Sequence, residues 1–484
     1  MIKKAAALIL AAMTLLTLMT ACSSKESEIQ TEPSETAETV TEAETTEPPL
    51  MHNVHDDLDF EGVDINIYYC PILANYNINQ QEQTGDNVED ALYTANFNAC
   101  EYLNCKFNFI EGPSGDIGNL SKSILADDHA YDIVYGIQWQ IAPLVAKHMF
   151  MNFSDNQYID FEKPWWFSEY IEEAAAGNGD IYILAGDLNL CTLRKASIGI
   201  INNDMLNDVG KSPEEIFNAV IDGTWTLDML YTLTNNMYSD LNGNGEYDEN
   251  DRYGIACYTA SDIDHYIIDS GIRVTKRDAD GVPELIFNNE NTVSCIEKVY
   301  KIFRENEGMY YRENAPIQNM LAENRVLFLN LKFTQLEVYR DIETSFSVIP
   351  MPKLNETIDR YGALVHDDTT IVCVPYNCQK IDAVAPCLEL LSYEGYNNVI
   401  PQYYDVSLKV KYNHDDNKDA SAMIDMIHDS ITTDFGYVYN YALNNIVCDI
   451  RSISSSKSFN FASYYAKKES KTVTKFAELL EAMG

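Results

Sequence analysis

The stretch Tyr131-Asp132-Ile133-Val134-Tyr135-Gly136-Ile137-Gln138-Trp139-Gln140 indicates most clearly which fold the chain adopts. It begins with β-branched and aromatic side chains, which predict a buried strand over Tyr131–Tyr135. A polar and aromatic loop, Gly136–Gln140, follows at the carboxyl end of that strand. Open α/β sheets bind ligands beside the carboxyl ends of their strands, so Gln138 and Trp139 are candidate binding residues.

On both sides of this stretch, short β-branched runs alternate with helical patterns. Before it, the sequence predicts strands at Val63–Tyr69 and Lys106–Ile110, and helices at Asn87–Leu103 and Ile117–Ala126. After it, strands are predicted at Ile181–Ala185, Ala196–Ile201, Arg325–Leu331, Ser345–Ile349 and Thr370–Val374. Beyond residue 379 the pattern is mainly helical. Alternating strands and helices are typical of an α/β fold.

The first 22 residues have the features of a signal peptide. Met1–Lys4 supply two positive charges, and Ala5–Leu18 form a run of apolar residues and threonines. This run is shorter than the roughly 20 residues that a membrane-spanning helix needs. A polar tail begins directly after Cys22, so a cleaved signal peptide is favoured over a permanent transmembrane helix.

Residues 23–58 are predicted to be a disordered tether. Residues 23–50 hold eight glutamates against one lysine, and most of the others are Ser, Thr and Pro. Such a segment has too few apolar side chains to offset the entropy lost on ordering. The folded body is therefore expected to begin near Asp59.

Size and charge narrow the possible functions. The 484-residue chain has a net charge of −42 and a pI near 4.3. The folded body exceeds the length that one core usually supports, which predicts two lobes. Nucleic-acid phosphates would be repelled by so acidic a chain, so no nucleic-acid partner is expected.

The cysteines indicate neither a zinc ribbon nor a dense disulfide scaffold. Ten remain besides Cys22, at irregular spacings and without a CxxC pair. Cys100 with Cys105, and Cys373 with Cys378, are close enough in sequence to pair. Because cysteine is also a common small core residue, we expect most of them to be core side chains.

The order of several segments resembles the extracellular solute-binding proteins of ATP-driven (ABC) importers, in particular the carbohydrate-binding group of Gram-positive bacteria. These segments are Tyr131–Gly136, Lys163–Trp166, Ile181–Asp187, Asn202–Leu206, Gly223–Thr226, Asp248–Gly254, Arg325–Phe328 and Ser345–Pro350. Thr20-Ala21-Cys22 likewise resembles the lipobox of bacterial lipoproteins, with Met19 where leucine is usual.

This resemblance implies a type II periplasmic-binding-protein-like fold, with two α/β lobes joined by crossing strands. The first lobe would comprise residues 59–187 and 345–391. The second lobe would comprise residues 188–344 and part of 392–484.

The function implied by the resemblance is solute capture for import. A lipid on Cys22 would hold the chain at the extracellular face of the cell membrane. A sugar or oligosaccharide would bind between the lobes and pass to the permease subunits of an ABC importer.

Two other functions stay open: a surface glycosidase, and a sugar-binding receptor or adhesin that serves no transport. The sequence contains no GxSxG, GxxxxGK or HExxH motif, and its eight histidines are scattered. With 75 acidic residues, a pair of carboxylates carries no information about glycosidase chemistry. We therefore predict that the chain is not an enzyme.

A sugar site needs aromatic faces for the apolar face of the ring and polar groups for its hydroxyls. The candidates are Gln138, Trp139, Asp187, Asn189, Lys332, His366, Asp367 and Asp368. Asp187 and Asn189 lie where the chain is expected to cross between lobes, and His366–Asp368 lie where it is expected to return. For each candidate the alternative is a structural role, such as Asp187 capping a turn.

The loop from Asp240 to Asp251 has the spacing of a calcium loop. Oxygen-bearing side chains occupy its positions 1, 3, 5, 9 and 12, and Gly245 stands at position 6, where the chain turns sharply. The predicted ligands are Asp240, Asn242, Asn244, Asp248 and Asp251, with the backbone carbonyl of Glu246. Asp251 replaces the usual glutamate. The alternative is an Asn/Gly-rich surface turn, and in either case a bracing role is expected.

Three tryptophans are interpreted as core residues rather than site residues. Pro164 before Trp165 and Trp166, and a helical stretch after them, suit a packing corner. Trp225 is expected to anchor the helix that follows it.

Overall fold

Two larger β-sheets organise residues 51–71, 78–113, 117–339, 342–404 and 418–484, which this computed structural model describes. The first sheet has the order β12-β3-β1-β2. Its strands are β1 (Val63–Tyr69), β2 (Cys105–Glu111), β3 (Ile133–Ile137) and β12 (Thr370–Cys373). β1, β2 and β3 run parallel, whereas β12 runs antiparallel to β3.

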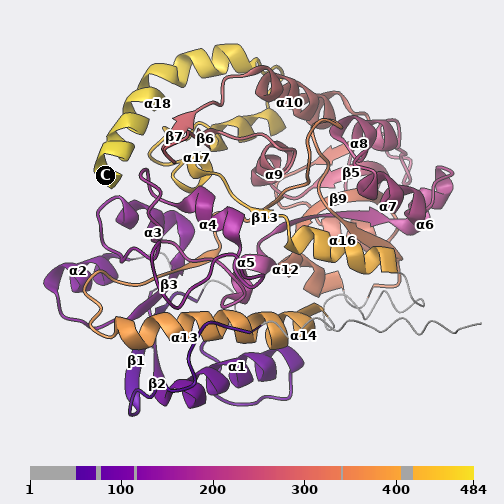
Figure 1. Cartoon of the computed structure of the whole chain (residues 1–484). Coiled ribbons are helices and arrows are strands. Elements are labelled where there is room, and N and C mark those ends of the chain that lie inside the picture. Colours follow the sequence, from indigo (N-terminus) through magenta and orange to yellow (C-terminus); the bar gives the residue numbers. More distant parts are fainter. Residues whose placement is uncertain (1–50, 72–77, 114–116, 340–341, 405–417) are drawn as a thin grey trace, which may run out of the picture. The chain divides into compact units, whose positions relative to one another are not determined.

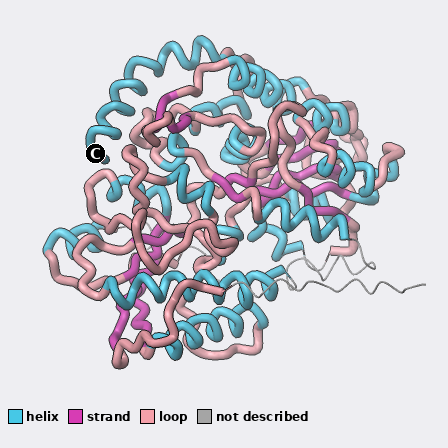
Figure 2. Tube along the Cα trace, in the orientation of Figure 1, coloured by secondary structure: helices cyan, strands magenta, loops and turns pink. Residues whose placement is uncertain are grey.

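The second sheet has the order β10-β4-β9-β5-β8. Its strands are β4 (Ser197–Asn202), β5 (Tyr253–Cys257), β8 (Met309–Tyr311), β9 (Val326–Lys332) and β10 (Phe346–Ile349). Here β4 is the antiparallel strand, and the other four share one direction. Each sheet thus contains one reversed strand, which is the first to enter it after the chain has crossed from the other sheet. Figure 2 shows the two groups of strands as separate magenta clusters.

Helices pack around these sheets (Figure 1). They are α1 (Asn87–Leu103), α2 (Gly118–Ala126), α3 (Gln138–Val145), α4 (Ser168–Ala174), α5 (Leu190–Arg194), α6 (Asn203–Asp208), α7 (Pro213–Ile221), α8 (Leu227–Thr234), α9 (Ile263–Ile268), α10 (Glu290–Tyr300), α11 (Ile317–Ala322), α12 (Phe333–Leu336), α13 (Ile381–Glu394), α14 (Ile400–Tyr404), α16 (Lys418–His428), α17 (Phe435–Val438) and α18 (Phe461–Met483). Two short ribbons pair β6 (Thr275–Arg277) with β7 (Pro283–Leu285), and β11 (Ala363–Leu364) with β13 (Ile431–Thr432).

Local sequence explains where several helices begin and end. Asp86 caps α1 by accepting hydrogen bonds from the backbone N–H groups of Val88 and Glu89. Asn104 ends α1 in the left-handed conformation, and β2 begins at the next residue. Ser212 and Glu215 form a reciprocal capping box at the start of α7.

The α/β fold with crossing segments is confirmed, and most strand predictions fall within one or two residues of the observed strands. Residues 181–185 form no regular strand, because only Leu184 makes a bridge, to Val372. The predicted loop Gly136–Gln140 is also wrong, since β3 runs to Ile137 and α3 starts at Gln138. The strands β5 and β8 were not predicted.

Two segments carry the chain between the sheets. The outgoing segment, residues 184–196, lies antiparallel to the returning segment, residues 365–372. They are bridged at Leu184 with Val372 and at Ala196 with Val365. The helix α5 occupies the outgoing segment between the two bridges.

The expected lobe boundary at residue 345 needs a correction. β10 pairs antiparallel with β4, so residues 346–349 belong to the second sheet rather than the first. The chain rejoins the first sheet only at β12. The misplacement arose because an isolated strand pattern does not reveal its pairing partner.

Cys22 and the acidic segment 23–50 lie outside the described residues. From His52 to Gly484 the chain is one compact unit. No helix among the described residues is long and apolar enough to cross a membrane. The ten cysteines of the described chain are unpaired, and seven are buried, as the interpretation of most cysteines as core residues required.

The tryptophan corner is confirmed as core. Trp165 and Trp166 are almost fully buried, and both indole N–H groups donate to the carboxylate of Glu389 on α13, at 3.2 and 2.8 Å. Trp225 is also buried and donates to the carbonyl of Pro350 at 2.9 Å. Burial raises the pKa of Glu389 to about 7, against the opposing effect of the indole hydrogen bonds.

We predict that Glu389→Gln removes part of the pH dependence of stability. The pKa of Glu389 is higher in the folded chain than in the unfolded chain. The folded chain is therefore stabilised at acid pH, and this contribution is lost as the pH rises through about 7. From about pH 5 to about pH 8 this group should cost about 2 kcal/mol of the free energy of unfolding. Glutamine keeps an acceptor for the indoles without the charge.

Urea denaturation at both pH values measures the effect. Glu297→Gln, at an exposed position of α10, is the control and should keep the wild-type pH dependence. An unchanged pH dependence in Glu389→Gln would contradict the assignment.

Candidate functional site

A pocket of about 540 Å³ opens beside the returning segment. It is lined by Trp139, Asp367, Tyr437, Val438, Asn440, Tyr441, Asn445, Cys448, Asp449 and Arg451. Trp139 stands at the start of α3, directly after the carboxyl end of β3. Asp367 belongs to the returning segment, and the backbone N–H of Trp139 donates to its carbonyl at 3.3 Å. The remaining lining residues come from α17 and the chain after it.

The lining combines aromatic and polar groups. Trp139 is 51% exposed and Tyr441 is 41% exposed, so both present ring surface to solvent. Asp367, Asn440, Asn445, Asp449 and Arg451 supply hydrogen-bond donors and acceptors around them. Such a surface can bind the apolar face of a ring and the polar groups at its edge.

Arg451 is held in place by a buried carboxylate. Its guanidinium donates through Nε to both oxygens of Asp264 at 3.0 Å, and through a terminal nitrogen to one of them. Asp264 is completely buried on α9. Burial opposes the charge on Arg451, but the hydrogen bonds and charge of Asp264 outweigh it and raise the pKa of Arg451. The arginine is therefore permanently charged at the pocket.

A second polar network joins the two crossing segments. Lys195, on the outgoing segment, donates to Asp368 at 2.5 Å, and the Nδ1 atom of His366 lies 2.7 Å from the same carboxylate. Burial disfavours the charge on Asp368, yet His366 and Lys195 more than compensate and hold its pKa well below the usual range. The backbone N–H of His366 also donates to the carbonyl of Lys195.

Lys332 lies at the carboxyl end of β9, close to this network. Among the described residues, no carboxylate lies within ion-pair distance of its ammonium group, although Asp262, Asp368 and Asp367 act on it at longer range. Burial lowers the pKa of Lys332. Its position at a strand end beside the returning segment agrees with the sequence prediction.

Four buried polar atoms around the pocket have no hydrogen-bond partner within the described residues. They are Nε2 of Gln138, His265 and His366, and the hydroxyl oxygen of Tyr437. The other polar atom of Gln138 accepts from Tyr170, and Nδ1 of His265 lies 3.0 Å from the amide oxygen of Asn330. Because buried polar groups are nearly always hydrogen-bonded, these four atoms are exceptions to the usual pairing; of their residues, Tyr437 alone is among those that line the pocket.

Of the eight predicted residues, six lie at or near the pocket and two lie elsewhere. Trp139 and Asp367 line the pocket itself. The other four are close by: Gln138 adjoins Trp139 in the chain, His366 and Asp368 adjoin Asp367, and Lys332 is within electrostatic range of Asp367. Asp187 and Asn189 lie on the outgoing segment but do not line the pocket.

Asp187 and Asn189 have structural partners. The carboxylate of Asp187 lies 3.3 Å from Nε2 of His428 on α16. Burial opposes the charge on His428, but Asp187 outweighs it and raises the pKa of His428 to about 10. Asn189 caps α5 and donates to the carbonyl of Thr370 at 2.5 Å. Both side chains are buried beside protein groups, although the second carboxylate oxygen of Asp187 has no hydrogen-bond partner within the described residues.

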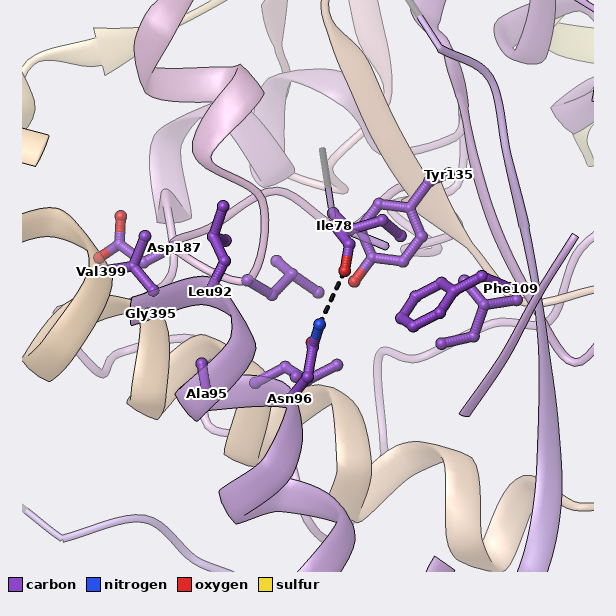
Figure 3. A pocket seen from close by; sticks show the side chains of 12 residues that line it. Ile78, Leu92, Ala95, Asn96, Phe109, Tyr135, Asp187, Gly395 and Val399 are labelled. Carbon is purple, nitrogen blue, oxygen red and sulfur yellow. Dashed lines mark hydrogen bonds between the residues drawn. The ribbon is translucent and has the colours of Figure 1, made fainter. Parts of the chain in front are cut away.

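Asp187 instead lines a separate small pocket, which lies between the first sheet and the helices α1 and α13. Figure 3 shows its carboxylate beside Gly395 and Val399, with Leu92 and Ala95 of α1 nearby. The volume of about 20 Å³ holds about one water molecule, so this pocket is too small for a sugar.

The prediction missed the pocket residues that follow α16. The sequence beyond residue 379 was interpreted only as mainly helical. It supplies five lining residues that were not predicted: Tyr437, Asn440, Tyr441, Asn445 and Arg451. One signal was available: tyrosine and asparagine are concentrated between residues 437 and 445.

The loop Asp240–Asp251 adopts a tight, exposed turn. The two carboxylate oxygens of Asp240 accept from the N–H groups of Gly243 and Gly245, at 2.6 and 2.9 Å. Asn244 donates to Asp248 at 2.9 Å. Buried Asp251 accepts from the N–H of Leu241 at 3.1 Å. The loop thus collects carboxylate and amide oxygens, which are the donors that calcium prefers. In the described part of the chain, this loop included, no three His, Cys, Asp or Glu side chains gather closely enough to hold one metal ion.

We predict that Asp187→Asn lowers the free energy of unfolding by about 3 kcal/mol, because it removes the buried carboxylate that faces Nε2 of His428 and leaves only exposed Asp429 beside Nδ1. Asp367→Asn, whose side chain is 28% exposed, should change it by less than about 1 kcal/mol. Urea denaturation of both variants measures the difference. Equal effects would contradict the division between a structural Asp187 and a pocket-lining Asp367.

No protein-family profile matches the chain, and a search of curated proteins finds no match. Solved structures do match. An ABC substrate-binding protein of Listeria monocytogenes, in complex with cycloalternan, has a TM-score of 0.53 at 11% identity, over 85% of this chain and 99% of that one. The maltose/maltodextrin-binding domain MalE of Bdellovibrio bacteriovorus, bound to maltotriose, has a TM-score of 0.51 at 15% identity, over 86% and 100%.

A cyclo/maltodextrin-binding protein complexed with maltotetraose gives a TM-score of 0.56 at 11% identity, over 87% of this chain and 98% of that one. At these identities the similarity concerns the fold alone. The chain therefore has the type II periplasmic-binding-protein fold that the sequence predicted.

Proposed function

We propose that this chain is a solute-binding protein that captures a sugar or oligosaccharide in the pocket between Trp139, Asp367 and Arg451. One observation carries the proposal: an exposed tryptophan at the end of β3 stands beside a carboxylate of the returning segment and an arginine fixed by a buried carboxylate. This combination suits a ring with hydroxyls along its edge. The similar structures were solved with oligosaccharides bound, which supports the same ligand class here.

Import is the role that this proposal favours. The predicted lipid on Cys22 would keep the chain at the extracellular face of the membrane, and the tether would let it reach the permease subunits of an ABC importer. The glycosidase alternative requires the bound sugar to be cleaved. The receptor or adhesin alternative requires binding without delivery to a permease.

We predict that Trp139→Ala weakens the binding of a saccharide by about 10- to 100-fold, because the stacking face is lost. A panel of sugars and oligosaccharides is first screened by thermal shift, since a bound ligand raises the melting temperature. Hits are then titrated by calorimetry against wild type and variant. The matched control is Phe97→Ala on α1, because Phe97 is 49% exposed and lies outside the pocket.

The outcomes separate the three functions. A saccharide that binds and is recovered intact supports capture, whereas recovery of shorter products would support a glycosidase. If no member of the panel shifts the melting temperature, or if Trp139→Ala binds as wild type does, the pocket assignment is wrong.

The loop Asp240–Asp251 is included in the proposal as a structural calcium site. The ligands would be Asp240, Asn242, Asn244, Asp248, Asp251 and the carbonyl of Glu246. A cation there would bind carboxylate and amide oxygens of the loop and brace the connection between α8 and β5.

Calcium should raise the melting temperature of the full chain by about 2–5 °C relative to chelator. Asp240→Asn removes the charge and one of the two oxygen acceptors for Gly243 and Gly245, and should abolish most of this shift. Asp382→Asn, at an exposed position of α13, should retain it. Equal melting temperatures of wild type in calcium and in chelator would reject the site.

A further inference from the structure

The helix α4 is fixed to the lobe built on the first sheet. Tyr170 on α4 donates a hydrogen bond to Gln138, the first residue of α3, which directly follows β3. Just before α4, the backbone N–H of Phe167 donates to the carbonyl of Ala185 on the outgoing segment at 3.1 Å. Contacts that reach α4 from the other lobe therefore join the two lobes directly.

Residues 273–277 reach α4 from the lobe built on the second sheet. They follow α9, and two hydrogen bonds hold α9 to that sheet. Nδ1 of His265 lies 3.0 Å from the amide oxygen of Asn330 on β9. The hydroxyl of Ser197 on β4 donates to the carboxylate of Asp269 at 2.6 Å.

The carboxylate of Glu169, in the first turn of α4, meets two arginines. Arg273 donates to one of its oxygens at 3.0 Å, and the hydroxyl of Thr432 on β13 donates to the same oxygen at 2.9 Å. Arg360, which precedes β11, forms an ion pair with the other oxygen. The side chains of Glu169 and Arg273 are only 20% and 23% exposed, so dissolved salt screens this pair less than a fully exposed one.

The other end of α4 is held by Arg277 on β6. Its guanidinium donates to the carbonyl oxygens of Glu172, Ala175 and Ala176, at 3.0, 2.8 and 3.1 Å. The last carbonyls of a helix lack partners within the helix, and a positive charge is favourable beside them. Two arginines four residues apart in the sequence thus hold the two ends of one helix.

The strand that carries these arginines is itself fixed next to the pocket. Buried Asp434 accepts hydrogen bonds from the backbone N–H groups of Val274 and Thr275, at 2.9 and 3.3 Å. Asp434 also caps α17, which carries the pocket residue Tyr437 and packs against α3 and α4. In Figure 1, α4, α17 and β6 are neighbours.

We propose that Arg273, Arg277 and Arg360 form a latch on α4, centred on Glu169, that keeps the two lobes closed without a ligand. The inference rests on the proposed function, since these are the lobes that would enclose the sugar. Every donor and acceptor of the latch belongs to the chain itself, so closure needs no contribution from a bound molecule. The apparent affinity for a ligand that requires the closed form falls in proportion to the closed fraction, so loss of the latch should weaken binding.

The test measures the distance between the lobes in the ligand-free full chain. Spin-labelled amino acids are incorporated genetically at Leu125 on α2 and at Ile221 on α7, which are 65% and 54% exposed, so the native cysteines stay unlabelled. Pulsed electron paramagnetic resonance should show one dominant distance population. Glu169→Gln removes the charge that two guanidiniums share, and should add a second population by lowering the closed-to-open ratio at least about 5-fold.

Glu172→Gln is the matched control, because it makes the same change at an exposed position of the same helix and should keep the wild-type distance distribution. Arg360→Ala removes one surface arm of the latch, whose side chain is 62% exposed. It should give a smaller second population, and it decides the question even if Glu169→Gln folds poorly. A single unchanged population in both latch variants, or two comparable populations in the wild-type chain, would overturn the proposal.

Failure of the latch can be told apart from failure of the proposed function, because the distances are measured without ligand. If Trp139→Ala weakens saccharide binding while the latch variants leave the distances unchanged, the pocket assignment stands and the latch is rejected. If the latch variants separate the lobes while no saccharide binds, the latch stands and the pocket assignment is rejected.

Discussion

The antiparallel contact between the two crossing segments is the constraint on which the rest of the structure depends. Residues 184–196 leave the first sheet and residues 365–372 return to it, bridged at both ends. Between the bridges, buried Lys195 donates to Asp368, and His366 lies against the same carboxylate. Because these segments connect both sheets, their pairing determines where the carboxyl ends of β3 and β9 meet.

The contact between the two crossing segments also fixes where charged side chains lie around the pocket. In a chain with a net charge of −42, three cations gather near the pocket. Lys195 and Arg451 have carboxylate partners at hydrogen-bond distance, whereas Lys332 has none within ion-pair distance in the described chain. Paired cations keep their positions without a ligand, whereas one imidazole nitrogen each of His265 and His366 is buried without a partner in the described chain.

The strand and helix predictions succeeded where short-range patterns determine structure. The helix at Asn87–Leu103 and the strand at Val63–Tyr69 have the predicted bounds. The strand β10 was located correctly to within one residue but placed in the wrong lobe, because hydrophobic alternation does not specify which strand is its neighbour. The same limit explains Asp187, whose partner His428 is 241 residues away in the sequence.

The sequence by itself determined the fold class, the crossing points near Asp187 and His366, and the place of Trp139 beyond the carboxyl end of β3, because each depends on residues close together in the chain. Only the tertiary structure decided that Asp187 and Asn189 are buried beside His428 and Thr370, away from the pocket, and that Tyr437, Tyr441 and Arg451 line it. Those roles depend on contacts between residues far apart in the sequence. Burial and pairing arise only when the two sheets and the C-terminal helices pack together, so no local pattern records them.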